Sequence, residues 1–243
     1  MIRKKCPLCG NTSRAFRASS SLRSSPDEMA HERARNLKIP GDGPRRNVQC
    51  PKCGSLDYER LLYLYLLHET ELFIPTAPEM RALYIRPTPR LAHAIERVWR
   101  VRLDTCTEQD LLEFEENTAR YDIVLCNHVF ERMRDESTAL RRVHGIAKRE
   151  ARIIVQSAVS PALPATFEDE ELDSERRRVR AFGNRERVRL YGQDFPERLS
   201  SAGFSVREFR RSTTDTRYGG LVNRYALPAG QVLFSLRRRE QIS

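Results

Sequence analysis

Four cysteines near the start of the sequence occur as two matched pairs. The segments "CPLCG" (6–10) and "CPKCG" (50–54) share the pattern CxxCG. In such a turn both sulfur atoms face one point and backbone amides near the glycine stabilise the thiolates, so two turns complete the tetrahedral sulfur set that zinc prefers. Because four protein ligands leave no position for water, the sequence predicts a structural Zn²⁺ bound by Cys6, Cys9, Cys50 and Cys53.

The residues between the two cysteine pairs do not extend this metal site. They include the polar run "RASSSLRSSPDEMAHERARN", and we expect much of the segment to be a loop. His31 lies there as a further candidate ligand, but a complete set of four cysteines leaves no vacancy for it. Two unrelated CxxC turns or a redox pair are the alternatives, although a thioredoxin-type site needs only one CxxC after a strand.

A second region with chemistry-bearing residues begins at "ALYIRPTPRLAHAI" (82–95). An apolar, strand-like burst runs into a turn and then into a helix-like stretch, which is the layout of a nucleotide-binding unit. The turn has no glycine, although bare backbone usually cradles the ligand there. Its residues are Arg86, Pro87, Thr88 and Pro89, and two prolines can still pre-set a rigid turn that presents backbone.

Polar residues also follow the next predicted strands, where a parallel sheet binds its ligands. They are Asp104, Asp110 and the run Cys126-Asn127-His128. A carboxylate after the second strand accepts hydrogen bonds from the ribose hydroxyls of adenosine-type ligands, which fits Asp104, but a helix N-cap ahead of "TEQDLLEF" explains it equally well. His128 is the best-placed general base, although a lone histidine after a strand is more often structural.

Alternating strand-like and helix-like segments predict the elements that position these residues. The alternation indicates an α/β protein with a mostly parallel sheet covered on both faces, and the last two strands suit an antiparallel hairpin at the sheet edge. A strongly apolar helix after the second cysteine pair connects the two regions. Strands are predicted at 82–86, 99–103, 121–126, 151–156, 204–209 and 231–237, and helices at 89–98, 135–147 and 193–202.

Composition narrows the class of protein. The hydrophobic content of 40% and charged content of 31% are globular values, no apolar run approaches the roughly 20 residues of a membrane helix, and the N-terminus lacks an apolar secretory region. We therefore expect a cytoplasmic protein with no membrane partner. The net charge of +10 raises the odds of a polyanionic partner, but most basic residues are arginine, which suggests a coding bias as much as a binding surface.

Several stretches resemble class I S-adenosylmethionine-dependent methyltransferases of the type 11 kind, in particular a bacterial subgroup with an N-terminal two-knuckle zinc ribbon. The matching stretches begin at "RRNVQCPKCG", "QDLLEFEENTARYDIVLCNHVFERM", "RAFGNRERVRLYGQDF" and "VLFSLRR". The resemblance implies a Rossmann-like methyltransferase domain at 81–243, preceded by a zinc-ribbon module at 1–58 and a connector helix and linker at 59–80. S-adenosylmethionine is the cofactor that it implies.

The resemblance also implies roles for individual residues. The loop after the first strand lies against the methionine part of the cofactor, the second-strand acid holds the ribose, a later pair approaches the adenine, and the fourth strand ends beneath the sulfonium. The "RVRLYG" stretch caps the site. By position these roles fall on Arg86 and Thr88, on Asp104, on Asp110 and Leu111, on Cys126, Asn127 and His128, and on Val188 to Gly192. Apart from the resemblance, Tyr191 and Asp194 are candidate contacts of the methyl acceptor.

The sequence departs from the family pattern at the same places. "RPTP" stands where members show "APEP", and "HVFERM" stands for "HVLEHV", which puts Arg132 in place of a histidine. The lost glutamate normally orients the amino acid moiety of the cofactor. Arg86 has the charge to pair with the methionine carboxylate, but it cannot accept a hydrogen bond from the ammonium. The six positions from Asp104 to Asp110 also indicate that the third strand of the family is lost or vestigial.

Methyl transfer asks the protein mainly to align the acceptor, exclude water and, for a hydroxyl acceptor, remove a proton. We therefore expect a methyltransferase for a small-molecule, sugar-like or natural-product-like acceptor, with His128 as base and Tyr191 as acceptor contact. The arginine-rich segment 174–189 is either a lid that reads a phosphate or carboxylate or a solvated helix face. The alternatives are a zinc-ribbon RNA methyltransferase and a catalytically inactive relative that binds a protein partner.

Overall fold

The computed structural model describes residues 3–18, 37, 45–74, 78–98 and 100–239, so His31 and most of the polar segment around it lie outside the described residues. The elements in chain order are β1 (Lys4–Lys5), β2 (Thr12–Ser13), α2 (Asp57–Glu69), β3 (Met80–Ile85), α3 (Pro89–Glu96), β4 (Val101–Cys106), α4 (Glu108–Glu113), β5 (Tyr121–Asn127), η1 (Phe130–Arg132), α5 (Glu136–Ile146), β6 (Ala147–Gln156), β7 (Phe167–Glu168), α6 (Glu175–Phe182), β8 (Arg189–Leu190), α7 (Phe195–Ser201), β9 (Phe204–Phe209), η2 (Thr216–Tyr218) and β10 (Leu233–Arg238).

Six strands form the central sheet in the order β4-β3-β5-β6-β10-β9. The first four of these strands run parallel, whereas β10 pairs antiparallel with β6 on one side and with β9 on the other. The α/β class, the mostly parallel Rossmann-like sheet and the C-terminal antiparallel hairpin are therefore confirmed. β4 forms one edge of this sheet, which agrees with the short interval that follows it in the sequence.

The strand order creates a switch point between β3 and β5. The chain enters the sheet at β3, moves outward to β4, and returns to add β5 and β6 on the other side of β3. The loops that follow β3 and β5 therefore leave the sheet in opposite directions. In open α/β sheets this divergence at the carboxyl ends of the strands is where ligands bind.

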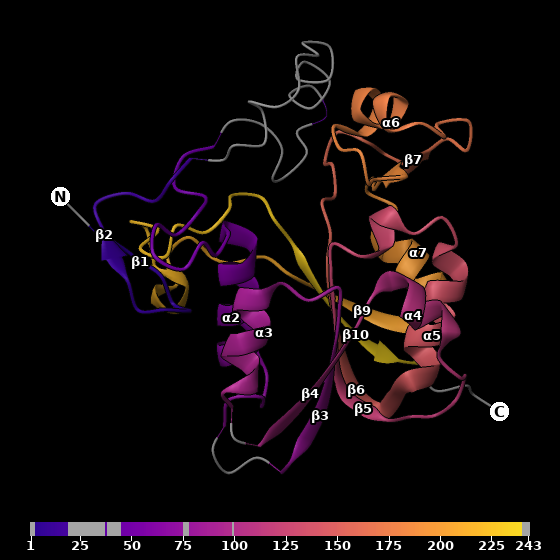
Figure 1. The fold of residues 1–243 in the computed structure, drawn as a ribbon, viewed down its shortest axis with the longest axis horizontal. Coiled ribbons are helices and arrows are strands. Elements are labelled where there is room, and N and C mark those ends of the chain that lie inside the picture. The colour runs from indigo at the N-terminus through magenta and orange to yellow at the C-terminus, as the bar shows by residue number, and fades with distance from the viewer. Residues whose placement is uncertain (1–2, 19–36, 38–44, 75–77, 99, 240–243) are drawn as a thin grey trace.

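Helices cover both faces of the sheet, as Figure 1 shows. α2 and α3 lie on one face, and α4, α5 and α7 lie on the other. The apolar residues of α3, which are Leu91, Ala92 and Ile95, recur at helical spacing and are buried against the sheet. Pro89 starts this helix, where its missing N–H is no loss.

The cysteine-bearing segments pack directly against the α/β core. The Lys5 N–H donates to the Arg224 carbonyl at 2.8 Å, and Ala226 is buried in one cluster with Cys6 and Cys50. The loop before β10 is thus the surface on which these segments rest. The boundaries predicted at residues 58 and 80 stay a prediction.

Elements outside the sheet differ most from the sequence-based prediction. α4 and α6 are expected from the sequence only as alternatives, and the short β7–β8 ribbon is not expected, because each of these elements is short and polar. Part of the arginine-rich segment forms α6, which ends at Gly183 in a left-handed conformation (φ 69°). Within the described residues, no helix is long and apolar enough to cross a membrane.

Candidate functional site

The two cysteine pairs meet in one cluster. The four Sγ atoms lie within 4.8 Å of one another, with 3.7 Å between Cys6 and Cys53 and 3.8 Å between Cys9 and Cys50. A tetrahedral zinc ion with Zn–S bonds of about 2.3 Å holds its sulfur ligands about 3.8 Å apart. The donor set and its spacing therefore fit a metal ion of zinc size.

Local backbone geometry brings the sulfur atoms together. Gly10 and Gly54 each adopt a left-handed conformation (φ 73° and 77°) and donate back to the carbonyls of Cys6 and Cys50 at 2.9 and 3.0 Å. A side chain at either glycine position would be strained. The Ser55 hydroxyl adds an outer contact, 3.2–3.3 Å from the Sγ atoms of Cys6 and Cys53. The motif spacing found in the sequence is thus explained by two turns of the same shape.

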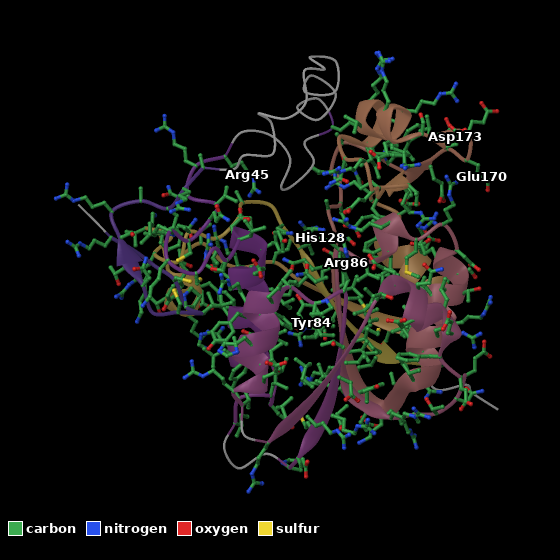
Figure 2. The ribbon with its side chains drawn as sticks, viewed as in Figure 1. Arg45, Tyr84, Arg86, His128, Glu170 and Asp173 are labelled. Atoms are coloured by element: carbon green, nitrogen blue, oxygen red, sulfur yellow. The ribbon has the colours of Figure 1, made fainter. Side chains whose placement is uncertain are left out.

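The second candidate site lies at the carboxyl ends of β3 and β5. Arg86 follows β3 and His128 follows β5, and both adopt a left-handed backbone conformation (φ 53° and 55°) that is unfavourable for residues with a side chain. Figure 2 shows these two residues with Tyr84 between the α2–α3 layer and the α4–α5–α7 layer. Strained residues of this kind cluster at functional sites. Here the two strained positions coincide with the switch point of the sheet.

A hydrogen-bonded network orients the His128 ring. Its Nδ1 lies 2.7 Å from the Glu131 carboxylate, whose other oxygen accepts from the Ser157 hydroxyl at 2.8 Å. The Gln231 side-chain amide lies 3.4 Å from Nε2, and the Tyr58 ring packs edge-on against the imidazole. This is the arrangement of a base held by a carboxylate, in which Nδ1 donates and Nε2 is left as the acceptor.

Glu131 is buried and ionised. Burial by itself would raise the pKa of this carboxyl, but the charge of the His128 ring when it is protonated and the hydrogen bonds from His128 and Ser157 lower the pKa from its ordinary 4.5 to about 2. The nearby Arg187 guanidinium acts in the same direction.

This lowered pKa predicts a pH dependence of stability. A carboxylate with a depressed pKa contributes stability that is complete above its unfolded-state pKa and is lost as the pH falls toward the folded-state value. The difference in unfolding free energy between the wild type and Glu131→Gln is therefore expected to shrink by up to about 1.4 kcal/mol per pH unit below pH 4.5. Urea titrations from pH 6 to pH 3 measure it, and a constant difference would contradict the assignment.

Three buried acceptor atoms belong to the first turn of α2 and to the ends of β5 and β6. Glu59 Oε1, Asn127 Oδ1 and Gln156 Oε1 accept no hydrogen bond from the described part of the chain. Asn127 and Gln156 are register partners at the ends of β5 and β6, and their amide groups donate to the Tyr84 hydroxyl and the Tyr58 carbonyl at 3.4 Å. Buried acceptors without donors are costly. Each of these atoms can therefore accept a hydrogen bond from a further donor.

The loop after β3 is held by ion pairs. Arg86 Nε lies 3.1 Å from Glu108, at the carboxyl end of β4, and Arg86 Nη2 lies 3.0 Å from Glu186, in the segment after α6. Glu186 also pairs with Arg132 of η1. Thr88 is the N-cap residue of α3, and its hydroxyl lies 3.2 Å from the Tyr84 hydroxyl. The residues of this loop thus face the switch point.

Asp104 does not lie where the sequence predicted it. It is inside β4, two residues before the strand ends, whereas we had placed it after the strand. Its carboxylate lies 2.7 Å from Nη2 of Arg81, which belongs to the neighbouring strand β3. The strand is longer than its apolar run because it continues after Leu103 through the polar pair Asp104 and Thr105 and ends at Cys106. The acidic side chain that follows β4 is Glu108.

Three of the other sequence-predicted residues have structural roles in this fold. Asp110 and Thr107 form a capping box at the start of α4, with hydrogen bonds of 2.8 and 3.1 Å. These hydrogen bonds lower the pKa of Asp110. Leu111 and Cys126 are fully buried in the core on the α4–α5–α7 face. Their assignment to the cofactor stays a prediction.

Tyr191 lies in the core on the α4–α5–α7 face of the sheet. It is fully buried, its hydroxyl donates to Glu136, and its ring stacks on Phe195. Asp194, the second acceptor-contact candidate, accepts a hydrogen bond from Thr166 at 2.7 Å. The site proposed below includes neither residue.

Sequence reasoning missed several residues that complete the site. Glu131 lies three positions after His128, a spacing that could have suggested the pair. Glu59 and Tyr58 lie within the helix that we had treated as an apolar connector, and only the packing of α2 over the strand ends reveals them. Gln231 reaches His128 from 103 positions away, so no local pattern could have indicated it.

No protein-family model matches the sequence, and no curated protein matches it. Among solved structures the chain is similar to 1,6-didemethyltoxoflavin-N1-methyltransferase of Burkholderia thailandensis with bound S-adenosylhomocysteine, at 15% identity and a TM-score of 0.43 over 83% of this chain and 95% of that one. It is also similar to phosphoethanolamine N-methyltransferase 2 of Haemonchus contortus (15% identity, TM-score 0.44, 74% and 53% covered) and to the YcgJ protein of Bacillus subtilis (15% identity, TM-score 0.43, 74% and 100% covered).

Proposed function

We propose that this protein is an S-adenosylmethionine-dependent methyltransferase that acts on a small-molecule acceptor and binds its cofactor at the switch point between β3 and β5. The observation that carries the proposal is the set of buried acceptors at Glu59, Asn127 and Gln156, which lack donors within the described residues. The sequence analysis left the cofactor ammonium without an acceptor, because "RPTP" lacks the family glutamate. Asn127 Oδ1 and Glu59 Oε1 have the acceptor chemistry that this requires, while Glu59 Oε2 accepts from the Leu56 N–H at 2.7 Å.

The residues of the site have distinct tasks in this proposal. Asn127 and Glu59 bind and orient the cofactor, and the edge-on Tyr58 and the α2 turn exclude water from the strand ends. When bound, S-adenosylmethionine supplies a methyl group on a sulfonium that is a good leaving group. His128 takes the acceptor proton on Nε2, and Glu131 stabilises the imidazolium that results. For this step the Gln231 amide has to give up its contact with Nε2.

For the cysteine cluster we propose a structural Zn²⁺. The four sulfurs spaced for a tetrahedral ion support it, and four protein ligands fill the positions that a reacting water would need. The metal then stabilises the N-terminal segments and takes no part in methyl transfer.

A second candidate function is a binding protein that has kept the fold without catalysis. Two observations favour it: Arg86 is held by ion pairs in the loop that would face the cofactor, and Asp104 lies inside its strand with Arg81 as partner. The RNA methyltransferase reading has no observation of its own among the described residues, and we do not propose it.

Calorimetry with S-adenosylhomocysteine tests the proposed function. We expect the wild type to bind, and Asn127→Ala to bind roughly 10- to 100-fold more weakly, because a buried hydrogen bond to a charged group contributes about 1.5–3 kcal/mol. Asp104→Ala is the matched control and should keep wild-type affinity, since its partner is Arg81. If the wild type does not bind S-adenosylhomocysteine at millimolar concentration, the methyltransferase function is rejected and the binding protein without catalysis remains. If Asn127→Ala and the wild type bind with equal affinity, the cofactor does not bind at Asn127.

A further inference from the structure

One carboxylate joins two arginines that are far apart in the sequence. Glu186 Oε2 lies 3.0 Å from Arg86 Nη2 and also pairs with Arg132. Arg86 follows β3, Arg132 ends η1, and Glu186 belongs to the segment that follows α6. These are also the two arginines that the sequence analysis singled out in "RPTP" and "HVFERM". They meet where the loop after β3 approaches η1, which begins two residues after His128.

The arginines are close enough to repel each other. Burial lowers the pKa of Arg132, and the guanidinium of Arg86 lowers it further, as does that of Arg187. The Arg132 side chain is 19% exposed, and its Nε is buried without a hydrogen-bond partner among the described residues. A pair of crowded, partly desolvated guanidinium groups needs an anion between them. In this structure the Glu186 carboxylate is shared by the two guanidinium groups, and Glu108 pairs separately with Arg86 Nε.

Glu186 is suited to being displaced. Its side chain is 48% exposed, so its carboxylate can turn into solvent by rotation about its own bonds. The backbone on either side is held, since Asn184 accepts from the Glu186 N–H at 2.8 Å and the Val188 N–H donates to the Glu131 carbonyl at 2.9 Å. Displacement therefore needs no movement of the chain.

We infer that Arg86 and Arg132 form a binding site for an oxyanion, a carboxylate or a phosphate, and that Glu186 occupies this site in the absence of ligand. Arginine presents paired N–H donors that match the oxygens of either group, which lysine does not. The ligand of this protein thus carries an oxyanion next to the reacting centre at His128. Glu186 competes with it and so favours ligands whose charge exceeds that of a single carboxylate.

This inference deepens the proposed function and rests on it for the identity of the ligand. Two molecules could supply the oxyanion: the methionine moiety of the cofactor, or the methyl acceptor. S-adenosylhomocysteine and 5′-methylthioadenosine distinguish them, because the second lacks the amino acid moiety. If the cofactor supplies the carboxylate, Glu186→Gln strengthens binding of S-adenosylhomocysteine alone. If the methyl acceptor supplies it, Glu186→Gln binds both nucleosides with wild-type affinity.

Binding of inorganic phosphate to the full chain tests the site itself. We expect Glu186→Gln to bind phosphate about tenfold more tightly than the wild type, measured by phosphorus NMR titration at fixed ionic strength. The double variant Glu186→Gln/Arg132→Met should lose that gain, and circular dichroism verifies that it folds. Glu175→Gln and Arg176→Met, both at exposed positions of α6, are the matched controls and should behave as wild type.

The outcomes separate this inference from the proposed function. Equal phosphate affinity of Glu186→Gln and Glu175→Gln overturns the oxyanion site, even if S-adenosylhomocysteine binds. A gain that persists in the double variant also overturns it, because the phosphate would then bind elsewhere. A gain that needs Arg132, found in a protein that binds no S-adenosylhomocysteine, supports the oxyanion site and rejects the methyltransferase.

Discussion

Serine in place of Cys50 is expected to release the metal and unfold the N-terminal segments. A structural zinc ion contributes on the order of 10 kcal/mol to the folding of the segments that hold it, far more than the few short hydrogen-bonded turns could supply. Cys50 is buried, and its sulfur lies 3.8 Å from that of Cys9. Metal analysis should give one zinc per wild-type chain and none per variant. Hydrogen exchange should show the amides of 45–56 losing protection.

Cys106→Ser is the matched control for this change. Cys106 is also buried, but it ends β4 in the core of the sheet and is not part of the metal cluster. The Cys106→Ser variant should keep one zinc per chain and full amide protection of 45–56, even where the change lowers the stability of the core. If Cys50→Ser also kept one zinc and wild-type stability, the four-cysteine assignment would be wrong.

Loss of the metal should reach beyond the N-terminal segments. Ala226 packs in the cysteine cluster, and the chain continues from it to Gln231, which contacts His128. Chelation is therefore expected to increase hydrogen exchange at 224–232 and to weaken ligand binding at the switch point. The structural metal would in this way stabilise one wall of the site from a distance.

The sheet could be predicted from the sequence because its central strands are buried on both faces. Runs such as "YDIVLCN" and "ARIIVQ" have continuous apolar centres, and all six predicted strands occur. The metal cluster was equally accessible, since CxxCG is a local motif that fixes its own geometry. Asp104 was misplaced because the end of β4 is polar, so the apolar run stops before the strand does.

The polar half of the candidate site could not be predicted because distant segments build it. The ion pair of Arg86 with Glu186 spans 100 positions, and the contact of Gln231 with His128 spans 103. A strand-end residue such as Asn127 can be located from its own strand. The acceptors and charges that face it depend on how α2 and the segment after α6 pack, which propensity and periodicity do not determine.

Methionine in place of Arg60 is expected to be the most destabilising single change outside the metal cluster. Arg60 is fully buried on α2, and its five N–H groups donate to five backbone carbonyls at 2.6–3.1 Å. The acceptors belong to both the cysteine-bearing segments and the loop before β10, so one guanidinium joins them to the helix. They are the carbonyls of Asn47, Val48, Ser55, Tyr225 and Ala226.

The expected loss in unfolding free energy for Arg60→Met is about 3–5 kcal/mol, the range seen when one partner of a buried charged network is removed. Methionine approximates the length of the side chain, so the loss reports the unpaired carbonyls and not a cavity. Arg60→Lys keeps the charge but has only three donors, and its loss should be intermediate. Arg90→Met, at an exposed position of α3, is the control and should change stability by less than about 0.5 kcal/mol. Guanidinium titrations measure all three, and a small effect of Arg60→Met would mean that the cysteine-bearing segments are not joined to the α/β core through this side chain.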